Sequence, residues 1–532
     1  MRDTQQDAAQ GRAAAAALLG EDTRPLAGMP VRNGPEAWVA FDKEVRRLHS
    51  ASSGPLRAGR TEARLCDPDG RIRASALAER RCPPLQLVLI RCADWVPAVR
   101  SRARRVLGRA VAKDPVRALT ELTPLVLRLA RREHGAWALE QLEAALTGRY
   151  SLLAAWWRPG RPSTTWSWNS LTGEQRDGIL DCLRGRADLA TRRFAVRLTV
   201  AAGTLGVREL ARQAAAEHDP VTNGMWTDAA LAAMASDGPD DEAIDTLLGA
   251  GSPTVRAAGV TALRRAGRAA EAADHLADRS GAVRACARWL LRQDGGDPYA
   301  HYRGLVADPE RVSPYAVTGF AECARRTDTP LLAALLVHPV GLVRAAALAG
   351  LRHLRAAPGN AALLALLDDP SASVAREAAL CLRPAAPQLD PGALAARTGP
   401  EHPLHTRRAA FRLLRAQGGI AALRAAVVLS VHPDPGLRRP AAETVSTWNW
   451  SATLEAKQAD RAELGVLLGA SAHVLRPEVR QLWRHRLGLN EEDRSTEPDA
   501  PDAPHPGRQG PEDRKGDRLR RLLLLRPLAP RQ

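Results

Sequence analysis

Arginine recurs at one fixed place in a repeated phrase of this chain, and its planar guanidinium can hold a carboxylate or several carbonyl oxygens at once. The phrase has the form Val-Arg-x-x-Ala and returns about every thirty residues. We expect its arginines to join adjacent repeats by bonding to the acids and carbonyls of the next unit. A ligand-binding column is the alternative interpretation. These arginines are Arg73, Arg100, Arg192, Arg256, Arg284, Arg344, Arg407 and Arg438.

A second set of arginines follows nine or ten residues after the valine position of the phrase, near the end of the same predicted helix. The helix dipole favours cations there, which is a sufficient structural reason for each residue alone. On successive helices, however, they would form a basic stripe that binds nucleic acid or an acidic protein surface. The set consists of Arg81, Arg109, Arg264, Arg265, Arg292, Arg352, Arg383 and Arg415. We take the six residues from Arg264 onward as candidate binding residues.

Tryptophan and arginine are interleaved in one segment that interrupts the repeat. The segment contains Trp156, Trp157, Trp166 and Trp168, together with two arginines. Tryptophans beside arginines can stack on the bases of a single strand, so we count these four as candidate binding residues. The structural alternative is that they fill an irregular joint where a helix is lost, as would a second Trp-x-Trp pair at residues 448–450.

Other patterns that carry chemistry are absent from the sequence. The seven cysteines form no C-x-x-C pair, and no glycine-rich phosphate loop is present. His402 and His405 have a spacing seen in metal sites, but Glu401 is the only acid beside them. We therefore expect no metal, no cofactor and no enzymatic activity. Scattered cysteines indicate buried free thiols in a reducing compartment, and no run is apolar enough to span a membrane, so we expect a cytoplasmic protein.

Helices must position both arginine sets, and the stretch around Val255 shows how one such helix is encoded. Ser252 followed by Pro253 predicts a helix start. Val255, Gly259 and Leu263 then fall on one helical face, where small residues allow a neighbouring helix to approach closely. An apolar helix precedes the phrase. Because two helices cannot bury both apolar faces alone, many pairs must stack around a continuous core.

Two copies of the phrase resemble the HEAT-like repeat family: DWVPAVRSRARRVL at residues 94–107 and HPVGLVRAAALAGL at residues 338–351. The period of about thirty residues is similar to that of the short bacterial variety, and the resemblance covers about residues 60–450. It implies a right-handed all-α solenoid of about twelve or thirteen stacked helical pairs that offers extended binding surfaces. The family serves many functions, so the resemblance does not identify a partner.

Composition divides the chain into three parts. Residues 1–33 are rich in Ala, Gln and Gly, and we expect a loose lead-in there. Residues 34–489 form the predicted repeat array, with a capping helix over 36–48 at its start. Residues 490–532 combine an acidic, proline-rich linker, expected to be disordered, with a short basic and apolar end. The formal net charge of +17 favours acidic partners.

These observations favour a non-catalytic scaffold that binds a partner protein on the surface of the solenoid. The alternative is a nucleic-acid-binding protein that uses the arginine stripe and the Trp-rich segment. A third hypothesis rests on a resemblance to HEAT-like DNA glycosylases of the alkylpurine type, whose paired pocket tryptophans are similar to Trp156 and Trp157. In that family an acid follows a few residues later, whereas this chain has Pro159, Gly160 and Arg161 there, which argues against catalysis.

Overall fold

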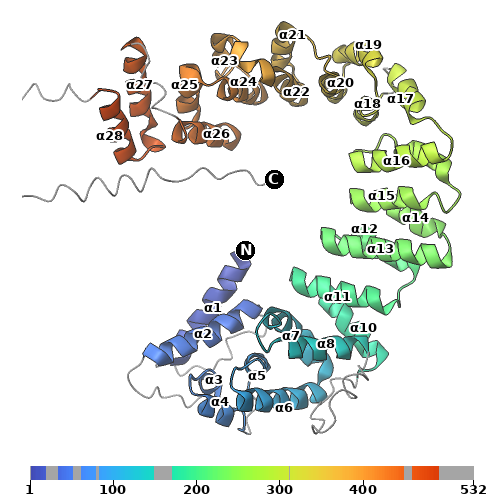
Figure 1. Ribbon diagram of the computed structural model, residues 1–532, viewed down its shortest axis with the longest axis vertical. Helices are drawn as coiled ribbons and strands as arrows, with labels where there is room; N and C mark the ends of the chain where they lie inside the picture. Colours follow the sequence, from blue (N-terminus) through green and yellow to red (C-terminus); the bar gives the residue numbers. More distant parts are fainter. Residues whose placement is uncertain are drawn as a thin grey trace, which may run out of the picture. The chain divides into compact units, whose positions relative to one another are not determined.

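The computed structural model is built of α-helices and short 3-10 helices (Figure 1). It describes residues 2–19, 34–51, 61–79, 83–148, 171–308, 310, 312–448 and 458–489. No strand occurs in these ranges, so the all-α fold class predicted from the sequence is confirmed. The chain forms two compact units, Met1–Ala357 and Pro358–Gln532.

In the first unit, each helix generally contacts the helix that follows it, and several also contact the next but one. Its early helices are α1 (Arg2–Leu19), α2 (Pro35–Ala51), α3 (Thr61–Leu65), α4 (Gly70–Ala76), α5 (Leu85–Arg91), α6 (Pro97–Lys113), α7 (Pro115–Leu129) and α8 (Ala136–Thr147). Its later helices are α10 (Gly173–Arg184), α11 (Leu189–Ala202), α12 (Val207–Ala216), α13 (Pro220–Asp237), α14 (Asp241–Leu248), α15 (Pro253–Ala262), η2 (Ala269–His275), α16 (Gly281–Gln293), α17 (Pro298–Ala307), α18 (Pro314–Ala321), η3 (Arg326–Asp328), α19 (Thr329–Ala334), η4 (Leu335–Val337) and α20 (Gly341–His353).

The second unit is also entirely helical in its described part. Its helices are α21 (Asn360–Ala365), η5 (Leu366–Asp368), α22 (Ala372–Leu382), η6 (Arg383–Gln388), α23 (Pro391–Ala396), α24 (Leu404–Gln417), α25 (Gly419–Leu429), α26 (Pro435–Ser446), α27 (Gln458–Ala470), η8 (Ser471–His473) and α28 (Pro477–Arg486). Among the helices described in both units, none is long and apolar enough to cross a lipid bilayer.

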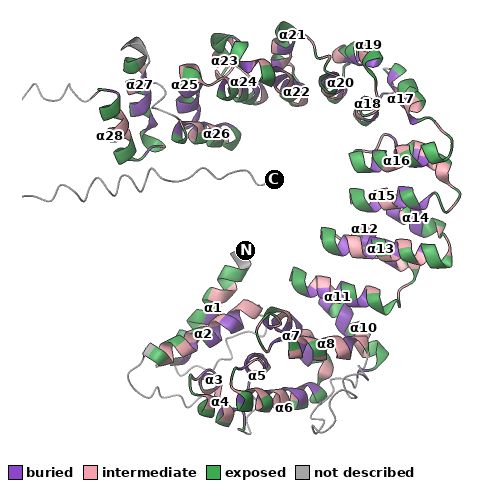
Figure 2. Ribbon diagram, viewed as in Figure 1, coloured by how far each residue is buried: buried purple, intermediate pink, exposed green. Residues whose placement is uncertain are grey.

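The core of the first unit follows the faces by which neighbouring helices meet, as the buried residues in Figure 2 show. One cluster of buried apolar side chains extends from Ala15 to Leu198, and a second extends from Val196 to Leu351. Burial of these side chains is the main favourable contribution to folding of such a stack. Polar side chains near the helix ends lie outside this core and can form hydrogen bonds and ion pairs with neighbouring turns.

Helix starts in the first unit use aspartate, serine and proline largely as the sequence predicts. Asp219 accepts a hydrogen bond from the amide of Thr222 at 3.1 Å, and Pro220 is the first residue of α13. Ser252 occupies the predicted position before α15, but its hydroxyl bonds to that of Thr254 at 2.8 Å and caps no helix amide. Proline at the first helical position is therefore the stronger of the two start signals in α15.

The N-terminal end of the chain differs from the loose lead-in expected for residues 1–33. Residues 2–19 form α1, which packs along α2. Ala15 and Leu18 are buried there and belong to the same core cluster as Trp38. An alanine-rich stretch has high helix propensity, and the apolar side of α2 supplies the packing that makes the helix stable. The capping helix predicted over 36–48 is present as α2, although it is the second helix.

Glycines allow several helix pairs to approach closely. A β-carbon at Gly259 of α15 would lie 2.9 Å from the backbone nitrogen of Leu248 in α14. A β-carbon at Gly319 of α18 would lie 2.4 Å from the ring of Tyr302, which is fully buried. The expectation that small residues permit close packing is therefore confirmed for Gly259, and Gly319 is a second example that the sequence did not single out.

Three repeat helices of the first unit end in the same backbone conformation. Gly267 after α15 and Gly295 after α16 are left-handed, with φ of 70° and 82°. Arg355 takes this place after α20 with φ of 55°, and the next amide, that of Ala356, donates to the carbonyl of Leu351 at 2.8 Å. Among the described residues Arg355 is the one non-glycine residue with a positive φ.

Substituting Arg355→Gly should raise the free energy of unfolding by about 1 kcal/mol, because glycine adopts the left-handed conformation without the steric cost of a β-carbon. Urea unfolding followed by circular dichroism measures the change. Gly295→Ala is the matched reverse variant, since no atom lies within 4 Å of the added β-carbon, and it should lower stability by a similar amount. A destabilised Arg355→Gly protein would show that the arginine side chain matters more than the backbone conformation.

Candidate functional site

The repeated-phrase arginines lie at joints between successive helices. Arg256 in α15 is a representative case, with 8% of its side chain exposed. Its Nη1 donates to the carbonyls of Ala250 and Gly251, both at 2.9 Å, in the turn before its own helix. Its Nε and Nη2 donate to the two carboxylate oxygens of Asp278, each at 2.9 Å. Arg256 therefore ties its own turn to the turn that precedes α16.

The contact with a carbonyl six residues earlier recurs along the described chain. It is made by Arg73, Arg100, Arg192, Arg284, Arg344 and Arg438. Arg407 donates instead to the carbonyl of Thr398 at 2.9 Å. The prediction that these arginines join repeats is confirmed where a later carboxylate also accepts, as for Arg256. The carbonyls, however, belong to the turn before the arginine's own helix and not to the next repeat.

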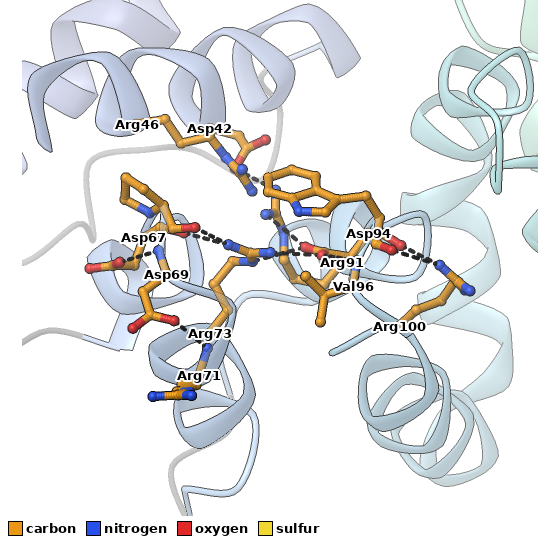
Figure 3. A network of polar contacts seen from close by, with 12 residues as sticks. Asp42, Arg46, Asp67, Asp69, Arg71, Arg73, Arg91, Asp94, Val96 and Arg100 are labelled. Carbon is orange, nitrogen blue, oxygen red and sulfur yellow. Dashed lines mark hydrogen bonds and ion pairs between the residues drawn. The ribbon is translucent and has the colours of Figure 1, made fainter. Parts of the chain in front are cut away.

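A single aspartate can serve two successive repeat arginines. The Asp278 carboxylate accepts from Arg256, and the Asp278 carbonyl accepts from Arg284 Nη1 at 2.8 Å. Asp94 has the same two roles in an earlier pair of repeats, where its carbonyl accepts from Arg100 at 2.7 Å (Figure 3). Each turn is thereby bound by the arginine of its own helix and by the arginine of the preceding repeat.

The joint around Asp94 is a buried network, shown in Figure 3. The Asp94 carboxylate accepts from Arg73 at 2.9 and 2.8 Å and from Arg91 at 3.2 Å. Arg91 also donates to Asp42 of α2, and all four of these side chains are buried. The guanidinium carbon of Arg73 lies 4.4 Å from the ring centroid of Trp95, which covers the pair. These groups bind one another, so their role is to hold α2, α4 and α5 together.

Two weaker copies of the phrase use the next residue for the acid contact. Arg193 follows Arg192 and donates to both carboxylate oxygens of Asp219, at 2.9 and 2.6 Å. Arg408 does the same with Asp434, at 3.2 and 2.6 Å. In both cases the aspartate begins the next repeat helix. In these copies the second arginine of the Thr-Arg-Arg sequence binds the aspartate, and Arg192 also contacts Glu217 at 3.4 Å.

Asp278 is held in its ionised form by its partners. Burial by itself raises the pKa of this carboxyl, but the hydrogen bonds from Arg256 and from the Ser280 amide outweigh burial and lower the pKa below its ordinary value. A carboxyl whose pKa is lower in the folded state stabilises the fold at pH values above its unfolded pKa, near 4. This contribution is lost as the pH falls through the lower, folded-state pKa.

Replacing Asp278 by asparagine should therefore cost stability at pH 7 and progressively less below about pH 4, where the wild-type carboxyl also becomes protonated. Urea unfolding of both proteins between about pH 3 and pH 7 measures this difference. Asp274→Asn is the matched control, because Asp274 is exposed in the neighbouring η2, and its effect should be small at every pH. A difference between wild type and Asp278→Asn that stays constant with pH would contradict the role assigned to Asp278.

The candidate arginines of the second set are all exposed. In the first unit, Arg264 and Arg265 follow the end of α15, while Arg292 and Arg352 lie in the last turns of α16 and α20. Their predicted place at helix ends is correct. Of the two earlier members of the set, Arg109 is exposed on α6 and Arg81 lies outside the described residues.

Two candidate arginines belong to the second unit and have different surroundings. Arg383 caps the C-terminus of α22 and begins η6. Arg415 lies in the last turn of α24 and forms an ion pair with Glu443 of α26 at 3.0 Å. Because a neutralised guanidinium attracts a polyanion less strongly, Arg415 is the weaker candidate of the two.

An exposed tryptophan lies beside the arginines at the end of α15. The guanidinium carbon of Arg264 lies 5.4 Å from the ring centroid of Trp289 on α16, and Trp289 is 41% exposed. Arg292 follows Trp289 by nearly one helical turn. The sequence analysis did not select Trp289. Its position three residues before Arg292 could have indicated it, because residues three apart lie side by side on a helix surface.

An apolar pocket of about 330 Å³ lies between the ends of α13 and α15, close to the end of α15 that Arg264 and Arg265 follow. Leu231, Met234 and Pro239 form much of its wall, and Arg265 lines it as the one charged residue. Sequence reasoning missed this pocket, because it arises from the packing of two helices. We use the term α15 edge for this pocket together with Arg264, Trp289 and Arg292.

Carboxylates border the α15 edge directly after Pro239, at the start of α14. They are Asp240, Asp241, Glu242 and Asp245. Arg208 pairs with the first and third of them, and Arg268 pairs with the second and fourth. The edge therefore combines an apolar centre, a basic side and a side of mixed charge.

The four candidate tryptophans, Trp156, Trp157, Trp166 and Trp168, lie outside the described residues. Of the second Trp-x-Trp pair, Trp448 is described. It is half-buried, and its indole N–H has no hydrogen-bond partner among the described residues.

The cysteines and His405 were singled out in the sequence as buried thiols and as part of a metal-like spacing. Cys66 and Cys92 are buried, and burial raises the pKa of each thiol. Cys182 is exposed and the other described cysteines are half-buried, so the expectation of uniformly buried thiols is wrong. His405 Nε2 lies 3.0 Å from the carbonyl of Asp369. Within the described ranges no three metal-binding side chains form a cluster.

Comparison with known proteins adds no assignment. A scan against protein-family models finds no match for this chain, and a search of the curated proteins finds no relative.

Proposed function

We propose that this chain is a HEAT-like repeat protein that forms a right-handed α-solenoid and acts as a non-catalytic binding scaffold. The repeated arginine joints support this proposal. A guanidinium that ties one turn to the next, as Arg256 and Arg73 do, gives these repeats the same kind of neighbour contact. Repetition of one contact is the basis of stability in stacked repeats.

The partner is a protein, and it binds at the α15 edge. The observation that carries this proposal is the apolar pocket that Arg265 lines, at the helix end where Arg264 lies over the exposed Trp289. An apolar anchor in a pocket with charged groups around it is the usual arrangement of the energetically important centre of a protein interface. The partner segment should therefore carry one large apolar side chain flanked by acidic residues.

The mixed charge around the pocket favours protein over nucleic acid. The carboxylates that follow Pro239 are already paired with Arg208 and Arg268, so the charges on this side largely cancel and attract a phosphate backbone less than a continuous basic stripe would. A protein partner can present carboxylates to the arginines and neutral polar groups to the ion pairs of Asp240 and Asp241. Electrostatic complementarity of this kind sets specificity in protein interfaces.

Selection of phage-displayed random peptides on the full chain tests this function. Peptides should be enriched that place Asp or Glu around a Leu, Met or Phe. Their affinity should fall at least about tenfold on a protein carrying Arg264→Glu, Arg265→Glu and Arg292→Glu, because three favourable charge contacts become repulsive.

A triple variant with Arg71→Glu, Arg105→Glu and Arg326→Glu is the matched control, since these arginines are also exposed in the first unit. It changes the net charge equally and should leave peptide affinity unaltered. Equal losses in both triple variants would mean that only net charge matters, and would contradict binding at the α15 edge.

Nucleic acid is the second candidate partner, and the exposure of all six candidate arginines favours it. If it binds, labelled single- and double-stranded DNA and RNA will show affinity that falls steeply between about 50 and 200 mM salt. Joint substitution of Arg264, Arg292 and Arg352 by alanine would then weaken binding and reduce the salt dependence while the fold persists. Fluorescence anisotropy measures both quantities.

A further inference from the structure

A second pocket, of about 270 Å³, lies in the second unit between α22 and α24. Three arginines, a histidine and a serine line it, together with two alanines. The polar residues are Ser373 and Arg376 from α22, and His405, Arg408 and Arg412 from α24. It is distinct from the α15 edge, which belongs to the first unit.

Helical spacing explains why these side chains meet. His405, Arg408 and Arg412 are separated by three and four residues, so they share one face of α24. Ser373 and Arg376 are three apart on α22, the helix that packs against α24. Alanine at the remaining lining positions 372 and 409 leaves the space between the two helices open.

Little carboxylate charge faces the pocket. Arg408 is paired with Asp434, at 2.6 Å. Arg376 contacts the Glu377 carboxylate through Nη2 alone, at 3.4 Å, a long distance for such a pair. Arg412 is exposed and lines the pocket, and it forms no ion pair with another described residue. The guanidinium of Arg412 and the nitrogens of Arg376 other than Nη2 therefore remain available for an anion.

We propose that the α22–α24 pocket binds the phosphate group of a small phosphate monoester. Guanidinium groups on two sides and a serine hydroxyl can surround the tetrahedral group and offer more donors than the two oxygens of a carboxylate can use. The pocket volume is at the low end for ligand sites, which suits a phosphate with a short attached group better than a nucleotide.

Isothermal titration of the full chain with glycerol 3-phosphate tests the proposal, with inorganic phosphate and acetate as further probes. Glycerol 3-phosphate and inorganic phosphate should both bind, and acetate should bind at least about tenfold more weakly. The double variant Arg376→Gln and Arg412→Gln should reduce affinity for both phosphates at least about tenfold, because it removes the two available charges. Both arginines are exposed, and circular dichroism should show an intact fold.

The matched control is a double variant with Arg439→Gln and Arg484→Gln, which removes two exposed arginines of the same unit outside the pocket. It should bind glycerol 3-phosphate like wild type. An equal loss in the control, acetate binding as tight as that of phosphate, or no heat from either phosphate would each overturn the proposal. Binding of a twenty-nucleotide single strand in the absence of binding by glycerol 3-phosphate would also overturn it, in favour of nucleic acid.

Discussion

Replacing Arg73 by alanine is expected to lower the free energy of unfolding by about 3 to 5 kcal/mol, the usual cost of breaking a buried ion pair from one side. The side chains of Arg73 and Asp94 are both fully buried. Without Arg73, the Asp94 carboxylate loses its two shortest side-chain hydrogen bonds and keeps Arg91 as its one charged partner among the described residues. The carbonyls of Asp67 and Pro68 also lose a donor.

Urea unfolding followed by circular dichroism measures the global loss, and hydrogen exchange of amides in α4 and α5 measures the local loss. Arg105→Ala is the matched control, because Arg105 is exposed on α6, and it should change stability by less than about 0.5 kcal/mol. If Arg73→Ala proved no more destabilising than Arg105→Ala, the joint in Figure 3 would not hold the repeats together.

Substituting Gly259→Ala is expected to destabilise the protein by about 1 to 3 kcal/mol, although alanine is the better helix former. The added methyl would lie 2.9 Å from the backbone nitrogen of Leu248 and 3.1 Å from the β-carbon of Leu247. Backbone atoms cannot rotate away as a side chain can, so α14 and α15 must move apart and lose contacts on both sides.

Gly304→Ala gives the opposite expectation and serves as the control. Gly304 lies within α17, is exposed, and has no atom within 4 Å of an added β-carbon. Alanine there should raise stability by about 0.5 to 1 kcal/mol. Urea unfolding of both variants measures their free energies of unfolding. A stabilised Gly259→Ala protein would contradict the close approach of α14 and α15.

The sequence predicted the helical fold class and the joint arginines because both depend on local, repeated signals. Arg256 directly follows the repeated valine, and repetition makes this position visible in one chain, whereas the distance along the chain to the accepting acid varies, from 21 residues for Arg73 to 26 for Arg193. The start of α15 was placed correctly by Pro253, whereas the hydrogen bond of Ser252 depends on the neighbouring Thr254 and could not be read from position alone.

The candidate site was predicted less completely. Exposure of Arg264, Arg265 and Arg292 follows from their place at helix ends. The pocket that Arg265 lines depends on how α13 and α15 pack, and a linear pattern carries no such information. The helix over residues 2–19 was missed for a similar reason, because its stability comes from α2 and not from its own composition alone.

Photo-crosslinking of a selected peptide is the most direct test of the proposed scaffold function. The apolar anchor of the peptide is replaced by benzoylphenylalanine, and the crosslinked residues of the full chain are identified by mass spectrometry. We expect crosslinks at the pocket wall, in residues 231–239 of α13 and its following turn, or at residues 261–265. Crosslinks confined to other helices, or spread over the whole chain, would contradict binding at the α15 edge.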